Sequence, residues 1–145
     1  MKAIASNPFV LDASLILSWA FADEMTPFTG WILERMSDGA EAVVPSLWPF
    51  EITNTLLIAE KRGRLTAAKS ASFLEELQNF NIVIDNLPLG RVFDRVAEEA
   101  RRFALTSYDA AYLELALRRG LPLATLDNAL KKAAKSVGVP LVVPN

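Results

Sequence analysis

The stretch Phe9-Val10-Leu11-Asp12-Ala13-Ser14 is a short apolar run that stops at a carboxylate, and beyond it apolar residues recur with helical spacing. Four more short runs follow, at Ala42-Val43-Val44, Ile82-Val83-Ile84, Leu123-Ala124-Thr125 and Leu141-Val142-Val143. None alternates apolar with polar residues, and segments of helical periodicity separate them. Such strands are typical of a parallel sheet that is buried on both faces. We therefore predict an α/β fold, a three-layer α/β/α sandwich with a parallel central sheet of about five strands.

Start and stop signals place the helices between these strands. Pro27 suits the first turn of a helix and Thr66 suits an N-cap, while Gly39, Gly63 and Gly120 suit helix ends. The predicted helices cover residues 14–21, 27–39, 47–61, 66–80, 89–104, 107–119 and 128–135. The sequence shows no repeat, no low-complexity segment and no linker, so we expect one continuous domain over residues 1–145.

The composition excludes most catalytic chemistries. Hydrophobic residues make up 52% of the 145 residues, which predicts a folded chain with a substantial core. The chain has no cysteine and no histidine, which excludes disulfides, thiol nucleophiles, catalytic imidazoles and zinc sites built on those residues. The net charge of -2 provides no general attraction for nucleic acid. Carboxylates, hydroxyls, amines and guanidinium groups remain, with any hard metal ion that carboxylates hold.

The segment 9–22 resembles the apolar part of a secretory signal, but Asp12, Ser14 and Ser18 interrupt it. No run approaches the ~18 apolar residues of a membrane-spanning helix. We therefore expect a cytoplasmic protein that does not contact a membrane.

Acidic side chains stand where the carboxyl ends of the predicted strands meet. Asp12 ends the first strand, and Thr125 with Asp127 ends the fourth. Asp109 and Glu51 each lie in the first turns of a predicted helix. Taken singly, an aspartate at such a position is an ordinary N-cap or a complement to the helix dipole, and Ser14 and Thr125 are ordinary cap or turn hydroxyls.

Glu51 is harder to explain as a structural residue. It lies in a helical segment that is apolar around most of its circumference, where an unpaired carboxylate costs several kcal/mol or more. Asp109 has a similar setting, because Glu114 and Arg118 form a solvent-side pair at i, i+4 away from it. Gathered carboxylates raise one another's pKa unless a cation joins them. The oxygen donors predict Mg²⁺ or Mn²⁺ in a shared acidic pocket.

Other uses of such a fold lack their residues. A dinucleotide site needs a glycine-rich first turn, and the turn here contains no glycine. The chain has no phosphate-binding P-loop sequence. Metal-dependent phosphodiester hydrolysis needs only carboxylates, a metal ion and water, and it is compatible with every residue present.

Four segments in order resemble the motifs of PIN-domain ribonucleases, and most of all the VapC toxins of toxin–antitoxin pairs. The matching segments are residues 10–14, 45–54, 105–113 and 121–127, so the resemblance covers essentially the whole chain. It implies an acidic site of Asp12, Glu51, Asp109 and Asp127, with Ser14 and Thr125 as supporting hydroxyls. Asp85 has no counterpart in this pattern and is expected to be a turn residue.

The resemblance also implies an activity and partners. It implies an endoribonuclease that needs Mg²⁺ or Mn²⁺ and leaves 5′-phosphate and 3′-hydroxyl ends, acting as the toxin of a VapBC-type pair. It implies a homodimer that is held inactive by a cognate VapB-type antitoxin. Asp12, Glu51 and Asp109 would bind the metal, and Asp127 would bind it directly or through water. Which group deprotonates the attacking water stays open.

Two alternatives remain beside the ribonuclease. One is a non-catalytic PIN-like module that binds RNA or acts as a scaffold, and the other is a metal-dependent DNA nuclease. We further expect the large apolar side chains Phe28, Trp31, Phe73 and Phe80 either to belong to the core or to form a dimer interface and an antitoxin groove.

Overall fold

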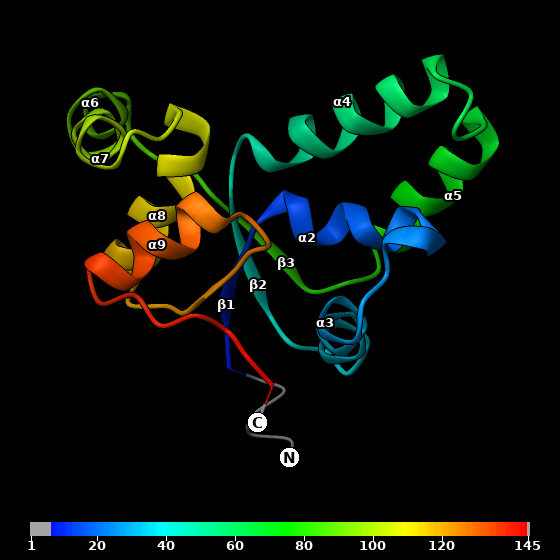
Figure 1. Cartoon of the computed structure of the whole chain (residues 1–145), viewed down its shortest axis with the longest axis horizontal. Coiled ribbons are helices and arrows are strands. Elements are labelled where there is room, and N and C mark those ends of the chain that lie inside the picture. The colour runs from blue at the N-terminus through cyan, green and yellow to red at the C-terminus, as the bar shows by residue number, and fades with distance from the viewer. Residues whose placement is uncertain (1–6, 145) are drawn as a thin grey trace.

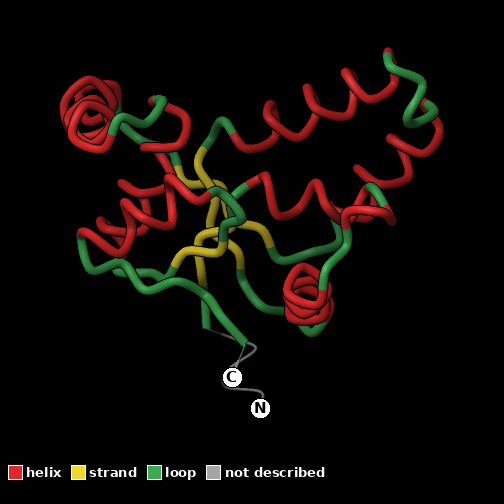
Figure 2. Tube along the Cα trace, in the orientation of Figure 1, coloured by secondary structure: helices red, strands yellow, loops and turns green. Residues whose placement is uncertain are grey.

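The computed structural model describes residues 7–144, and at its centre lies a four-stranded parallel sheet (Figures 1 and 2). The strand order is β3-β2-β1-β4. The strands are β1 (Phe9–Leu11), β2 (Ala42–Pro45), β3 (Ile82–Asp85) and β4 (Leu123–Ala124). β1, β2 and β4 are buried throughout, which confirms the prediction from their unbroken apolar runs. For β3 the prediction was wrong, because this strand lies at the edge of the sheet and is only partly buried.

The expected fifth strand is reduced to a single bridge. Leu141 pairs with Leu123 of β4, where the Leu123 N–H donates to Pro140 and the Val142 N–H donates to Leu123, both at 2.9 Å. Pro140 and Pro144 stand on either side of this segment, and proline cannot donate to a ladder. The apolar residues are therefore present, but the backbone makes no further pairing.

The helices begin and end close to where the sequence signals place them. Thr26, Thr66 and Thr106 each accept a backbone N–H from the third residue of the following helix. The α-helices are α2 (Ala13–Leu17), α3 (Pro27–Ser37), α4 (Trp48–Lys61), α5 (Ala67–Leu77), α6 (Leu89–Arg91), α7 (Ala97–Phe103), α8 (Ser107–Arg119) and α9 (Asn128–Ser136).

Two of the predicted helices are broken. The one predicted for residues 14–21 is α2 followed by the short 3₁₀ turns η1 (Ser18–Ala20) and η2 (Ala22–Glu24). The one predicted for residues 89–104 contains a π-helical segment, η3 (Val92–Val96), between α6 and α7. π-Helical turns are rare in proteins, and those that occur are often near functional sites.

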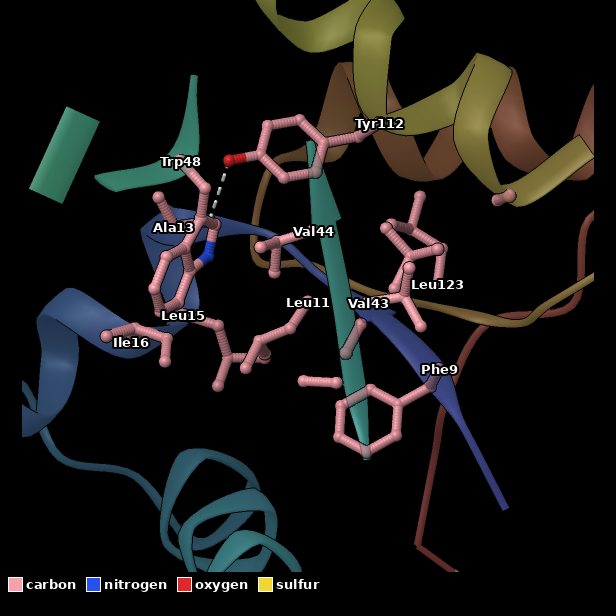
Figure 3. Close-up of a cluster of buried hydrophobic side chains, with 14 of the residues drawn as sticks. Phe9, Leu11, Ala13, Leu15, Ile16, Val43, Val44, Trp48, Tyr112 and Leu123 are labelled. Carbon is pink, nitrogen blue, oxygen red and sulfur yellow. Dashed lines mark hydrogen bonds between the residues drawn. The ribbon is translucent and has the colours of Figure 1, made fainter. Parts of the chain in front are cut away.

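Helices cover both faces of the sheet and form the expected three layers. Figure 1 shows α2 to α5 on one side of the strands and α6 to α9 on the other. α8 packs against β1 and β2, and α2 packs against α4. In Figure 3 the side chains of Leu11, Leu15 and Trp48 fill the space beside the strands, with Tyr112 at the edge of the same cluster.

The four aromatic side chains considered for an interface are partly buried and pack against this core. They are Phe28, Trp31, Phe73 and Phe80. They contribute to the core and keep part of their surface exposed. The most exposed large apolar side chains lie elsewhere, on α4, α6, η3 and α8 and in the C-terminal segment: Phe50, Leu89, Phe93, Tyr108 and Val143. Within the described residues, no helix is both long and apolar enough to cross a membrane.

The i, i+4 pairing with Arg118 predicted Glu114 on the solvent side, and this prediction was wrong. Glu114 is 2% exposed and accepts hydrogen bonds from Arg118 Nε at 3.0 Å and from Arg91 Nε at 2.7 Å. Arg118 also pairs with Asp85, so Asp85 is an ion-pair partner at the end of β3. The pairs connect α6, α8 and β3, and a sequence pattern within one helix cannot predict such links.

Glu99 makes folding stability depend on pH. Burial, followed by the charge of Glu114, raises its pKa to about 7, and Oε2 accepts no hydrogen bond from the described residues. A carboxyl group whose pKa is raised on folding holds its proton in the folded chain between about pH 4.5 and 7, so stability is full below this range and falls as pH rises through it. Glutamine does not titrate, so Glu99→Gln should escape this loss. The stability of Glu99→Gln minus that of wild type should rise from pH 4.5 to pH 8 by on the order of 1 kcal/mol after solvent screening.

Thermal melts of Glu99→Gln and wild type at pH 4.5 and at pH 8 measure this stability difference. The exposed neighbour Glu98→Gln serves as the control and should show a smaller pH-dependent change. An equal response of the two variants would contradict the assignment to Glu99.

Candidate functional site

The neighbouring parallel strands β1 and β4 bring the first and last acidic residues together. Leu11 lies opposite Ala124 in the register, and the Asp12 N–H donates to the Ala124 carbonyl at 2.9 Å. Asp12 and Thr125 therefore leave the sheet side by side, and Asp127 follows two residues later. The carboxyl edge of an open α/β sheet is the usual place for a ligand site.

The Asp12 carboxylate is buried and fixed by two hydroxyl groups. It is 4% exposed, and its Oδ2 accepts from Ser14 Oγ at 2.8 Å and from Thr125 Oγ1 at 2.6 Å. It is also the N-cap of α2 through the Ser14 N–H. The capping role and the place in the acidic pocket thus belong to the same side chain. Ser14 and Thr125 both donate a hydrogen bond to Asp12.

Thr125 also connects Asp12 to Asp127. Its Oγ1 accepts the Asp127 N–H at 3.0 Å while its hydroxyl donates to Asp12. Asp127 caps α9, where Oδ2 accepts the Leu130 N–H at 2.9 Å and the other carboxylate oxygen is left for other partners. The distance between the two carboxylates is therefore set by a short, hydrogen-bonded loop.

Glu51 reaches the same region from α4. Its Oε1 accepts a hydrogen bond of 2.5 Å from the Tyr112 hydroxyl, and that hydroxyl accepts the Ala13 N–H at 3.3 Å. Figure 3 shows the Tyr112 hydroxyl pointing toward the start of α2. Through Tyr112, the position of Glu51 is tied to the residue that follows Asp12.

Asp109 completes the group from the first turn of α8. Its N–H donates to Thr106 Oγ1 at 3.1 Å, which fixes the start of the helix. Asp109 is half-buried, and Tyr112 follows it by three residues on the same helix face. α8 therefore supplies both a carboxylate and the hydroxyl group that holds Glu51.

The electrostatics show that these carboxylates share one region. Burial is the largest cause of a raised pKa for Asp12, Glu51 and Asp109. The charge of Asp127 further raises the pKa of Asp12, and the charges of Asp12 and Asp109 further raise the pKa of Glu51. The groups that lower the pKa of these three carboxylates are hydroxyl and backbone hydrogen-bond donors. No basic side chain of the described residues is among them. The pocket thus has a deficit of positive charge.

The donor set fits a hard divalent cation. All its donors are oxygen atoms, from half-buried or buried carboxylates that repel one another. Within residues 7–144, no three acidic side chains lie close enough together to hold one metal ion in the conformation described. Mg²⁺ usually keeps several waters and binds through one or two carboxylates, so an open arrangement of this kind suits it.

Tyr112 is the site residue that sequence reasoning missed. It is fully buried, and burial raises the pKa of its hydroxyl well above the usual range, with further contributions from the charge of Asp12 and from Glu51. A buried tyrosine normally places its hydroxyl against a polar partner. A tyrosine three residues after a candidate catalytic aspartate, in an otherwise apolar helix, was the available signal.

Under the RNA hydrolysis that the family resemblance implies, Tyr112→Phe should weaken cleavage about ten- to a hundredfold while lowering stability by about 1 kcal/mol. The change removes the hydrogen bond that orients Glu51 and leaves the Ala13 N–H without its acceptor. Rates per folded molecule, corrected by thermal melts, measure the effect. Tyr108→Phe changes an exposed ring of the same helix and should cut like wild type. Wild-type rates in Tyr112→Phe would show that Tyr112 only fills the core.

The acidic residues lie at the ends of β1 and β4 and at the starts of α4 and α8. This arrangement on a parallel sheet is the one that the resemblance to PIN-domain proteins implied. The family model described as PIN domain matches residues 9–136, and the chain belongs to this family. Ribonuclease VapC3 of Pyrobaculum aerophilum is 30% identical over 132 residues, which cover 90% of this chain and 98% of that protein.

Solved structures show the same fold. PAE2754 from Pyrobaculum aerophilum superposes with a TM-score of 0.64 and 28% identity, covering 89% of this chain and 80% of the other. FitAcB from Neisseria gonorrhoeae gives a TM-score of 0.54 at 17% identity, covering 94% of this chain and 97% of the other. A domain of a Methanocaldococcus jannaschii protein gives 0.53 at 16% identity, with 97% and 92% covered.

Proposed function

We propose that this chain is a divalent-metal-dependent endoribonuclease, the toxin of a VapBC-type pair. The observation that carries the proposal is the pocket in which Asp12, Glu51, Asp109 and Asp127 repel one another without a neutralising basic group. The similarity to Ribonuclease VapC3 over nearly the full length of both chains supports RNA as the substrate.

Asp12, Glu51 and Asp109 would hold Mg²⁺ or Mn²⁺, with Asp127 binding it directly or through water. Such an ion, when bound, activates water for attack on phosphorus and balances the negative charge that develops on the phosphate. The chain's own contribution is to fix the carboxylates before substrate arrives. Ser14 and Thr125 orient Asp12, and Tyr112 orients Glu51, so neither carboxylate has to reorganise during the reaction.

A panel of labelled single-stranded RNAs and the matching DNAs, with Mn²⁺ and with EDTA, tests the proposal. We expect cleavage of RNA that needs the metal and leaves 5′-phosphate ends. Cleavage of DNA in preference to RNA would assign a DNA nuclease instead. Binding of RNA without cleavage under any metal would assign a non-catalytic module.

The proposed partners are a second copy of the chain and a VapB-type antitoxin. The exposed side chains of Phe50, Leu57 and Ile58 on α4 support this proposal, because positions 50, 57 and 58 lie on one helix face and are 78%, 49% and 41% exposed.

Light scattering at tens of micromolar should give a dimer mass, and Phe50→Glu should shift it toward the monomer. Phe93→Glu, at a similarly exposed position on η3, is the control for a general loss of surface hydrophobicity. A monomeric wild type at this concentration would contradict the dimer.

A further inference from the structure

A cavity of about 210 Å³ lies beside the acidic pocket and takes no part in the mechanism above. It opens between the carboxyl ends of β2 and β3, one face of α8 along most of its length, and η3. Leu47, whose carbonyl accepts the Glu51 N–H at 3.0 Å, lines it, as does Tyr108, the residue before Asp109. The lining therefore includes the neighbour of Asp109 and a residue one helical turn before Glu51, although none of the four candidate catalytic carboxylates itself lines the cavity.

Three charged side chains line this cavity, and they already pair with one another. Arg118 donates to Asp85 through Nη2 at 2.5 Å and through Nη1 at 3.3 Å, and to Glu114 through Nε at 3.0 Å. Arg91 also pairs with Glu114 and Arg119 also pairs with Asp85, so none of these three guanidinium groups is left free for a phosphate group. The pairing of both carboxylates with Arg118 equally leaves no isolated negative charge for a cation.

The same groups keep hydrogen-bonding capacity for a neutral ligand. The guanidinium of Arg118 has N–H groups on Nη1 and Nη2 beyond those that contact Asp85, and the Asp85 oxygens have further lone pairs. Because two carboxylates fix Arg118, this pair of donor and acceptor is held in place before any ligand binds. A donor beside an acceptor at fixed spacing is what recognition of a nucleobase edge requires.

The rest of the lining suits the faces of a flat ring. Val92, Val96, Ala111 and Leu115 are apolar, and the exposed Tyr108 ring, at 62%, is also part of the lining. An apolar slot with a few fixed polar groups is the usual form of a small-ligand site. Proteins that recognise single-stranded RNA stack unpaired bases on aromatic rings and hydrogen-bond the base edges.

We propose that this cavity holds one unpaired nucleobase next to the scissile phosphate, with its face on Tyr108 and its edge on the Arg118–Asp85 pair. The inference rests on the proposed ribonuclease function and adds to it a determinant of cleavage-site preference. A nucleobase of single-stranded RNA is the ligand class, and phosphate is not.

Two pairs of variants test this assignment. Val92→Trp fills the cavity from η3, an element that carries none of the four candidate catalytic carboxylates. Val143→Trp makes the same change at an exposed position outside the cavity. Tyr108→Ala removes a ring from the cavity lining, and Phe93→Ala removes a similarly exposed ring on η3 that does not line the cavity. Because Tyr108 is largely exposed, the second pair remains informative if Val92→Trp does not fold.

Affinity for a fluorescein-labelled pool of random single-stranded RNA 12-mers, measured by anisotropy in EDTA, gives a readout without cleavage. Val92→Trp and Tyr108→Ala should bind about tenfold more weakly, the size of one lost base stack, and the two control variants should bind like wild type. Sequencing the ends cut from the same pool with Mn²⁺ should show a base preference beside the cut that both cavity variants flatten.

The outcomes separate this inference from the proposed function. Metal-dependent cleavage with an unchanged base profile in folded Val92→Trp and Tyr108→Ala would overturn the base pocket and leave the ribonuclease standing. A protein that never cuts RNA, yet loses affinity in the two cavity variants only, would retain the pocket and overturn the nuclease. Weaker binding in Val143→Trp or Phe93→Ala to the same degree would overturn the pocket.

Discussion

Asp12→Asn should reduce RNA cleavage by about a thousandfold or more while leaving the metal-free protein at least as stable as wild type. Asparagine keeps the shape of the buried side chain, and its carbonyl oxygen accepts from the Ser14 and Thr125 hydroxyls in the place of Oδ2. Its amide group gives up the long cap contact of 3.4 Å with the Ser14 N–H. It removes a negative charge that raises the pKa of Glu51 and Asp109. The loss of activity would therefore come from lost metal binding and not from unfolding.

Thermal melts with EDTA and with Mn²⁺ separate these contributions. Wild type should gain about 2.7 kcal/mol at a hundredfold excess of metal over its dissociation constant, because the ion relieves the repulsion in the folded state only. Asp12→Asn and Asp109→Asn should both show a smaller gain. Asp38→Asn, at the exposed end of α3, is the matched control and should respond like wild type. Equal metal responses in all of these proteins would mean that Asp12 and Asp109 do not form the site.

Glu51→Gln should likewise leave a folded protein whose cleavage rate falls by about a thousandfold. The glutamine carbonyl oxygen takes the place of Oε1 and accepts the Tyr112 hydroxyl, so the link between α4 and α8 persists. What is lost is the negative charge that a metal ion requires.

The opposite reading of Glu51 is a buried structural residue. It predicts that Glu51→Gln melts at a lower temperature and keeps an activity proportional to the folded fraction. Cleavage rates and melts on the same preparations distinguish the two readings, with Glu60→Gln near the other end of α4 as the control. A destabilised variant that cuts at the wild-type rate per folded molecule would refute the catalytic role of Glu51.

Local features of the sequence were sufficient for the architecture. The unbroken apolar runs at β1 and β2 predict strands covered on both faces, because a strand with one solvated face would alternate. The caps of α3, α5 and α8 were readable because an N-cap hydroxyl bonds to a backbone N–H only three residues away. Interactions of such short range are encoded in the adjacent residues.

The grouping of the acidic residues was predictable for a related reason. Parallel strands present their carboxyl ends at one edge, so Asp12 and Asp127 had to approach one another once β1 and β4 were parallel. Glu51 and Asp109 were inferred from the cost of placing a carboxylate among apolar neighbours. The family resemblance supported the same four residues.

Only the tertiary structure decided which side chains meet across elements. Three of these contacts join residues that are 23 or more positions apart: Arg91–Glu114, Asp85–Arg118 and Glu51–Tyr112. The Glu114–Arg118 contact alone is local. The sequence carries the chemistry of each group but not the packing of α8 against the sheet that brings them together. For the same reason the last apolar run was predicted as a strand, although the backbone of that segment pairs with β4 only at Leu141. Periodicity records which residues are to be buried, and the partner that buries them is fixed only when the elements pack.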